Sequence, residues 1–444
     1  MLDALRNAWR LPDVRNRLLI TGLILLIYQF AAHVPVVGVD RNNLARLLDP
    51  STQGAQFIQV LNLLSGGAVS NFSVIANGVY PYITASIIFQ LLVPIIPALE
   101  QMQREPGGQE KLQRYTYFLT IPMALLQAFG QIQIFNANLA ASGGGVIIPG
   151  FGSNLLLTLS VLASMTAGTM FAVWLGELIT EQGIGNGISI IIFAGIVAST
   201  PTNLANLIAN SPQWVWDVLL FVVLTLASVV VIIYIQEGVR RIPVQYGKRV
   251  RGRKQYGGAS THIPMRVNPV GMIPLIFAQA IITLPAVFAS FFPPGPLGTS
   301  LQTTFGNQQG FLYWFFFFLL TFGFTFFYSD VMIANQNLAD NLQRNGGFIP
   351  GIRPGKRTED YILRVTRRIT LVGALFLGII AILPGLVDAL NQLLFRGAIV
   401  TTGLGNAAQV ISGAGLIIVV GVVIDTLRQL EAQLVMRNYE GFMR

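Results

Sequence analysis

The residues that could perform acid–base, nucleophilic or metal chemistry are few in this 444-residue chain, and their placement argues against catalysis. There are no cysteines and only two histidines, His33 and His262. No HExxH zinc motif occurs, and the pairs Gly247-Lys248 and Gly355-Lys356 are both followed by Arg, where a phosphate-binding loop has Ser or Thr. We therefore expect a protein that is not an enzyme and that binds no cofactor or metal.

The rest of the chain is far more apolar than a water-soluble protein. Only 11% of its residues are charged and 53% are hydrophobic, whereas a soluble protein has about 25% charged residues. No Asp, Glu, Lys or Arg occurs from Tyr115 to Gly176, from Gln182 to Trp216 or from Val267 to Ser329. Runs of this length fit successive membrane spans of about 20 residues, and backbone groups in lipid require helices. The composition indicates an all-α polytopic membrane protein.

The apolar runs predict ten transmembrane helices, which divide into two halves of five. They lie near 18–34, 73–97, 115–135, 154–176, 188–208, 214–236, 269–291, 311–330, 369–388 and 407–427. The halves are 1–212 and 213–444. Because each half has an odd number of spans, the two cross the membrane in opposite directions, which permits an inverted repeat.

Basic residues predict the orientation of these spans. All but three of the 28 Lys and Arg residues fall on one side, which also carries both termini. The three on the other side are Arg41, Arg46 and Arg396. Since cytoplasmic loops are enriched in Lys and Arg, both termini are expected in the cytoplasm.

Acidic residues near the apolar runs bear on the choice between a channel and a transporter. Ion-coupled transporters usually carry ionisable groups inside the bilayer. Here the carboxylates lie at the ends of runs or in loops, at Glu177, Glu181, Asp217, Glu237, Asp330, Asp388 and Asp425. A pathway without charges favours a channel, and a secondary transporter for a small solute is the alternative.

One short apolar segment precedes the second span. Its apolar residues recur at helical spacing, at Phe57, Val60, Leu61 and Leu64, and the sequence Ser65-Gly66-Gly67 follows them. The helix is too short to cross a membrane. On pattern alone, an amphipathic helix that rests on the outside of the protein is the simpler interpretation.

Six segments resemble the SecY family, the central channel subunits of the Sec protein translocon, of bacterial type. Two long ones are Phe72–Leu92 and Trp174–Ile192. The shorter ones are Arg241-Ile-Pro-Val-Gln-Tyr246, Ser260-Thr-His-Ile-Pro264, Gly347-Phe-Ile-Pro-Gly-Ile-Arg353-Pro-Gly355 and Tyr439-Glu-Gly441. They occur in the family's order across nearly the whole chain. Asn77 departs from the pattern, because the family has an aliphatic residue there.

The resemblance implies a protein-conducting channel, which moves unfolded secretory polypeptides across the cytoplasmic membrane and releases transmembrane segments sideways into lipid. Segment 57–72 would contain a short re-entrant plug helix. By position, a constriction ring would consist of Val79, Ile83, Ile192, Ile276 and Ile418. A narrow apolar ring excludes water and ions, which fits a resting channel. Most aliphatic residues in membrane spans, however, face lipid or another helix.

The resemblance also implies a lateral gate bordered by the second, third, seventh and eighth spans. Gln90, Gln127 and Gln279 lie on three of these spans. Their amides are expected either to bond across the gate helices, each bond contributing about 1 kcal/mol, or to bond within their own helix.

Two basic cytoplasmic loops, 237–268 and 331–368, are the predicted docking surfaces. Their candidate residues are Arg240, Arg241, Lys248, Arg249, Arg251, Arg253, Lys254, Arg353, Lys356 and Arg357. Dense basic charge suits phosphate backbones and acidic protein surfaces. The resemblance implies docking of the ribosome and of the SecA motor ATPase, with SecE and SecG as membrane partners, in the bacterial cytoplasmic membrane.

Overall fold

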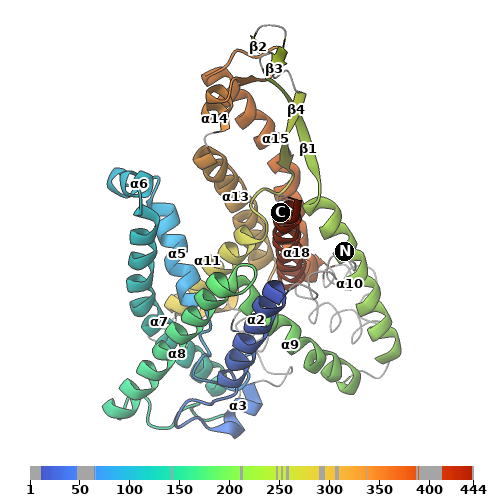
Figure 1. Ribbon diagram of the computed structural model, residues 1–444. Helices are drawn as coiled ribbons and strands as arrows, with labels where there is room; N and C mark the ends of the chain where they lie inside the picture. Colours follow the sequence, from blue (N-terminus) through green and yellow to red (C-terminus); the bar gives the residue numbers. More distant parts are fainter. Residues whose placement is uncertain are drawn as a thin grey trace.

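The computed structural model contains a bundle of helices with a projection of strands at one end (Figure 1). It describes residues 12–47, 65, 67–141, 144–210, 214–246, 249–251, 254–256, 260–289, 296–305, 310–336, 338–386, 389 and 413–442. The prediction of a mainly α-helical fold is confirmed.

Each of the ten predicted apolar runs contains a helix. The helices up to residue 210 are α2 (Pro12–Ala31), α3 (Arg41–Leu47), α5 (Tyr80–Leu92), α6 (Pro97–Arg104), α7 (Gly108–Ala141), α8 (Leu155–Gln182) and α9 (Gly187–Asn210). The later helices are α10 (Trp214–Gln236), α11 (Ile273–Ala289), α12 (Pro296–Phe305), α13 (Phe311–Gln336), α14 (Leu338–Arg344), α15 (Lys356–Ala381) and α18 (Gly413–Phe442). Helix α10 has the predicted bounds.

Not every one of these helices is long enough to span a membrane alone. Four in the described ranges meet criteria of length and hydropathy, at Pro12–Ala31, Gly108–Asn136, Leu155–Gln182 and Phe311–Arg344. A fifth is the pair α5 and α6, bent by 106° at a short break, if both parts are counted as one span. The number of ten spans therefore stays a prediction.

The second predicted span, 73–97, is helical over only part of its length, which corrects the sequence analysis. Helix α5 begins at Tyr80, and most of the segment before it consists of turns. Phe72 and Gly78 have φ angles of 42° and 54°, which lie in the left-handed region of backbone conformations. Left-handed residues end a right-handed helix. The chain therefore cannot run as one helix from residue 73 to Leu92.

The turns before α5 are packed tightly against α8. Phe72, Ile75 and Val79 are almost completely buried. Gly168 of α8 makes this packing possible, because a Cβ atom at that position would lie 2.1 Å from the carbonyl oxygen of Val74. Helix α8 and this segment therefore form one rigid support for the start of α5.

The loop 237–268 contains β-strands, which the sequence analysis did not predict. Strand β1 (Val239–Tyr246) pairs antiparallel with β4 (Ser260–Arg266), and β5 (Gly347–Phe348) pairs with the other edge of β1. A separate antiparallel pair is formed by β2 (Arg249–Arg251) and β3 (Lys254–Tyr256). Because β5 comes from the second basic loop, the sheet joins both predicted docking loops.

The three-stranded sheet rests on helices that continue beyond the apolar bundle. Ile242 and Val244 of β1 are buried and alternate with exposed residues, which is the pattern of a strand with one covered face. They belong to a hydrophobic cluster with Leu342 of α14, Ile349 and Ile362 of α15. This cluster fixes the projection to the bundle.

The largest hydrophobic cluster lies where the two predicted halves meet. It contains buried residues from α2, α5, α8 and α9 in the first half and from α10, α11, α13, α15 and α18 in the second. The helices of both halves thus share one core, and the candidate ring residues lie in it.

Candidate functional site

The five candidate ring residues all belong to this shared core. Their exposed fractions are 0% for Val79, 7% for Ile83, 1% for Ile192, 7% for Ile276 and 2% for Ile418. They come from the start of α5 and from α9, α11 and α18, so both halves contribute. A role in a constriction stays a prediction, but the fold gathers these aliphatic side chains into one cluster.

Two of these residues are placed by the first turn of α5. The amide of Ile83 donates a hydrogen bond to the carbonyl oxygen of Val79 at 3.1 Å. Residues four apart in a helix share a face, so Val79 and Ile83 present adjacent side chains to the core. The packed turns before α5 hold this face in position.

Most of the candidate plug lies outside the described residues, namely Phe57, Val60, Leu61, Leu64 and Gly66. Ser65 and Gly67 are described. The carbonyl oxygen of Ser65 accepts a hydrogen bond of 2.7 Å from the hydroxyl of Tyr28 in α2, and Ser65 is only 1% exposed. Gly67 has a φ of +88° and no atom within 4 Å of an added Cβ. The end of the candidate plug is therefore anchored at α2, next to a glycine turn.

The three candidate gate amides differ in their partners. Gln90 is exposed and donates to Ser86 Oγ in its own helix at 2.9 Å. Gln127 of α7 donates to Thr84 Oγ1 of α5 at 3.3 Å, and Gln279 of α11 donates to the hydroxyl of Tyr313 in α13 at 3.3 Å. The last two bonds link helices within a half, and none of the three amides links α5 to α11.

Tyr80 forms one bridge between the halves, which the sequence analysis missed. Its hydroxyl donates to the carbonyl oxygen of Ala280 in α11 at 2.8 Å and lies 2.5 Å from Thr283 Oγ1. Tyr80 and Thr283 are both buried, at 7% and 1% exposed. The sequence around Tyr80 does not indicate this bond, because its partner Ala280 is 200 residues away in the chain.

Asn77, which departs from the family pattern, has a structural partner. Its side-chain Nδ2 donates to the carbonyl oxygen of Ala124 in α7 at 3.2 Å, and Asn77 is 7% exposed. The amide thus ties the turns before α5 to α7. A buried polar group with a partner is compatible with the apolar surroundings.

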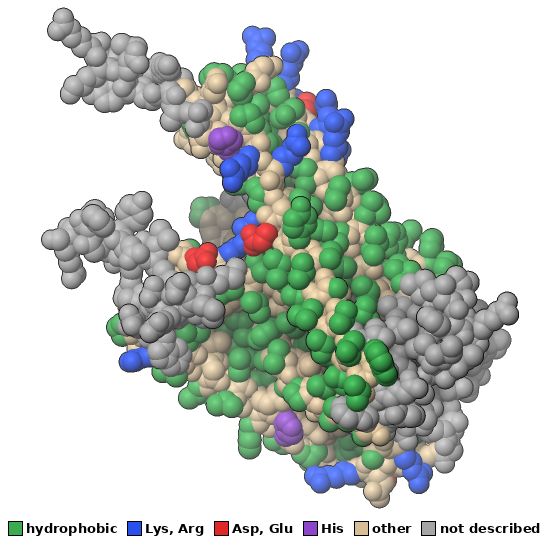
Figure 2. Space-filling model, turned by 90° about the vertical axis from the view of Figure 1, so that its right-hand side faces the viewer, with side chains coloured by type: hydrophobic (Ala, Val, Ile, Leu, Met, Phe, Trp, Pro, Cys, Tyr) green, Lys and Arg blue, Asp and Glu red, His purple; other side chains and the backbone are tan. Residues whose placement is uncertain are grey.

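The candidate docking residues lie on the strand projection and beside it. Arg240 and Arg241 are exposed on β1, and Arg353, Lys356 and Arg357 are exposed around the start of α15. Figure 2 shows Lys and Arg side chains at the top of the molecule, above a body with a mostly hydrophobic surface. Arg249, Arg251 and Lys254 lie in β2 and β3, while Lys248 and Arg253 lie outside the described residues.

Metal chemistry gains no support from the described residues. No group of three or more His, Cys, Asp or Glu side chains within those ranges could hold a metal ion. The arrangement instead combines an apolar core shared by two halves with a basic surface at one end.

Comparisons with known proteins agree with this arrangement. The SecY family model matches residues 73–427. The protein translocase subunit SecY of Bacillus licheniformis is 41% identical over 455 residues, covering 100% of both chains. A solved structure of a protein conducting channel has a TM-score of 0.62 at 17% identity, covering 97% of both chains. Sec61 in the canine ribosome-channel complex from the endoplasmic reticulum has a TM-score of 0.59 at 17% identity, again covering 97% of both chains.

Proposed function

The chain belongs to the SecY family, and we propose that it is the protein-conducting channel of a translocon, which moves unfolded secretory polypeptides across the cytoplasmic membrane. The observation that carries this proposal is the aliphatic cluster shared by the two halves, with Val79, Ile83, Ile192, Ile276 and Ile418 in it. As a member of the family, the chain is a multi-pass membrane protein. Transmembrane segments of client proteins would leave sideways into lipid.

The five aliphatic residues would form the seal of the resting channel. An apolar constriction dewets, so ions and water do not pass, while flexible aliphatic side chains can make room for a peptide. The plug segment would add a second barrier, and the bond between Tyr28 and Ser65 would hold its end when the rest moves. A secondary transporter would instead need a closed site for a small solute between the halves.

The function can be tested by crosslinking. A photoreactive amino acid at position 83 should form an adduct with a secretory chain stalled during translocation, because the chain would pass through the ring. Position 197, where Val197 is 46% exposed on the surface of α9, serves as the control. A transporter for small solutes would give no adduct at position 83.

The lateral gate would open where α5 separates from α11. These helices come from different halves, and the bonds from Tyr80 to Ala280 and Thr283 would have to break. Gln127 and Gln279 would keep each side of the gate together, since both bond within their own half. Gln90, exposed on α5, would face the membrane or an entering signal sequence.

We expect Tyr80→Phe to relax the selection of signal sequences. The variant keeps the aromatic side chain in the core and loses a hydrogen bond that contributes about 1 kcal/mol. This loss corresponds to a roughly fivefold shift of the equilibrium toward the open gate. Import of a precursor with a weakly hydrophobic signal into membrane vesicles measures this effect. Tyr82→Phe removes a hydroxyl from the same helix and should leave selection unchanged. Unaltered selection by Tyr80→Phe at equal channel content would contradict a role as a latch.

The basic end of the molecule would face the cytoplasm, with both termini on that side. The strand projection, α6 and α14 lie toward one end of the molecule, and α3 lies toward the other (Figure 1). This separation matches the two sides predicted from the Lys and Arg residues and supports the orientation by the positive-inside rule.

The basic end would also receive the partners. We propose SecA and the ribosome as ligands of the strand projection, and SecE and SecG as membrane partners. Dense basic charge on a rigid sheet suits both phosphate groups and acidic protein surfaces. The similarity to Sec61 in a ribosome-channel complex supports the ribosome as a partner.

A further inference from the structure

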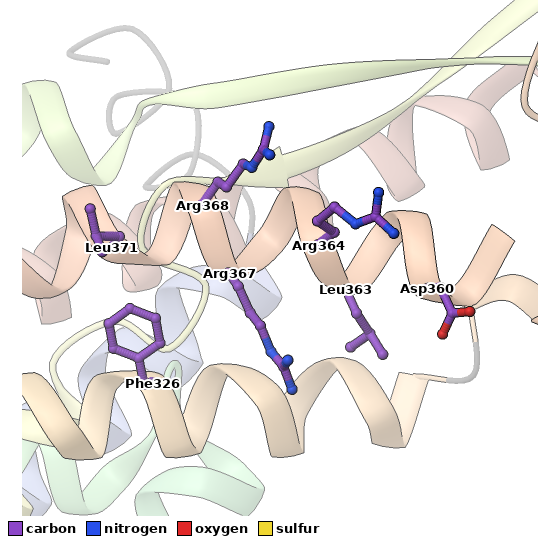
Figure 3. Close-up of a pocket in the computed structure, with 7 residues that line it drawn as sticks. All are labelled: Phe326, Asp360, Leu363, Arg364, Arg367, Arg368 and Leu371. Carbon is purple, nitrogen blue, oxygen red and sulfur yellow. The ribbon is translucent and has the colours of Figure 1, made fainter. Parts of the chain in front are cut away.

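A pocket between α13 and α15 lies at the boundary between the apolar bundle and the basic end. It has a volume of about 560 Å³ and is lined by Phe326 from α13 and by Asp360, Leu363, Arg364, Arg367, Arg368 and Leu371 from α15. Figure 3 shows Arg364 and Arg368 on one edge of α15, while Arg367 reaches toward α13. The lining thus combines three guanidinium groups with three apolar side chains.

Arg367 has a structural partner and closes one wall of the pocket. Its Nε lies 3.2 Å from both carboxylate oxygens of Asp330, and its terminal nitrogen donates to Asp330 Oδ2 at 3.0 Å. The same carboxylate raises the pKa of Arg367, so this residue stays charged. The pair clamps α13 to α15 and leaves little charge for a ligand.

Arg364 and Arg368 are therefore the positive groups that a ligand can use. Both are exposed, and neither forms a salt bridge within the described part of the chain. They lie four residues apart on one helix, so their side chains are neighbours. Two adjacent guanidinium groups provide forked donors that suit a phosphate. Asp360 lies one turn before Arg364 and limits the net charge at the outer end.

The apolar part of the pocket continues along an exposed side of α15. No charged residue follows Arg368 in this helix, which ends at Ala381. Leu371, Leu375 and Ile379 are 47%, 40% and 50% exposed and recur every four residues. A ligand with its phosphate on the two arginines would therefore place any attached acyl chain on an apolar stripe.

We propose that this pocket binds an anionic glycerophospholipid of the cytoplasmic leaflet. Arg364 and Arg368 would hold the phosphate, and Phe326, Leu363 and Leu371 would contact the first part of the acyl chains. Basic pockets between membrane helices on the cytoplasmic side suit such headgroups. The inference rests on the proposed orientation in the membrane and does not depend on which substrate passes the channel.

The experiment compares lipid binding to the purified full-length chain and its variants in nanodiscs of zwitterionic lipid. Phosphatidylglycerol is titrated in, and its binding is measured with a fluorescent analogue. The double variant Arg364→Gln/Arg368→Gln should bind about thirtyfold more weakly, since each basic residue near a membrane surface contributes about 1 kcal/mol and about 1.4 kcal/mol is a factor of ten. The control Arg114→Gln/Arg344→Gln removes two exposed basic residues outside the pocket and should bind as the original protein does.

Two further measurements decide between the outcomes. Leu371→Asn should weaken binding of the lipid, whereas soluble glycerol phosphate should not compete at similar concentrations. Equal affinity for glycerol phosphate would make the pocket a site for free phosphate and overturn the proposal. Equally weakened binding by the control pair would mean that general surface charge, and not this pocket, attracts the lipid. Unchanged binding by the Arg364/Arg368 variant would also refute the proposal. Failure of the crosslinking experiment at position 83 would leave these results unaffected.

Discussion

Arg353→Glu is expected to lower SecA-driven translocation by at least about tenfold without changing the amount of inserted channel, because hydrogen bonds to charged groups contribute about 1.5–3 kcal/mol each. Arg353 is exposed in the short connection between β5 and α15. The measurement is ATP-dependent import of a secretory precursor into inverted membrane vesicles. The amount of channel in the vesicles is determined in parallel.

The physical reason is that the backbone holds Arg353 on a fixed tip. The hydroxyl of Thr358 donates to the carbonyl oxygen of Arg353 at 3.0 Å, and Gly351 and Gly355 have φ angles of +82° and +104°. Pro354 further restricts the chain. A guanidinium on such a tip loses little entropy on binding and can grip a carboxylate with two bonds.

Two comparisons separate docking from membrane topology. Arg353→Lys keeps the charge and loses the fork, so an intermediate loss of import is expected. Arg344→Glu makes the same change of charge on the neighbouring helix α14, where Arg344 is exposed, and should have a smaller effect. Full import by Arg353→Glu at equal channel levels would mean that Arg353 contributes only to the membrane topology, together with the other basic residues of its loop.

The positions of the apolar helices could be predicted from the sequence, but their ends could not. The predicted run 369–388 begins directly after the charged residue Arg368, whereas α15 already begins at Lys356. Its extra turns are stabilised because Ile362 is buried in the hydrophobic cluster that joins α15 to the strand projection. Charge marks where a helix leaves the lipid, and packing determines where the helix ends.

The strands and the bridge between the halves depended on contacts that no local pattern reveals. Ile242 and Val244 alternate with exposed residues, but Pro243 between them argues against a central strand. The sheet is covered by apolar residues of α13, α14 and α15, which lie far from β1 in the sequence. Tyr80 contacts Thr283 because α5 and α11, which are distant in the sequence, meet in the fold. The five aliphatic ring candidates were identified through the family resemblance, and in the structure they belong to one core.

The double variant Ile83→Asn/Ile192→Asn is expected to raise the ion conductance of resting channels about tenfold above background. Both side chains are almost completely buried in the core shared by the halves, and they come from α5 and α9. Amide groups stabilise water in a narrow apolar passage, so the constriction would no longer dewet. Conductance is measured on the channel reconstituted into planar bilayers without a translocating chain.

The same substitution at exposed positions on the surface of the helix bundle provides the control for this prediction. Val197 of α9 and Leu226 of α10 are 46% and 60% exposed, so Val197→Asn/Leu226→Asn adds two amides to the membrane surface of the protein. Any general damage from amides in the bilayer would appear in both variants, whereas wetting of a pore would appear only in the first. If Ile83→Asn/Ile192→Asn inserts normally and conducts no more than this control, the buried cluster is ordinary helix packing, and the seal must lie elsewhere along the interface of the halves.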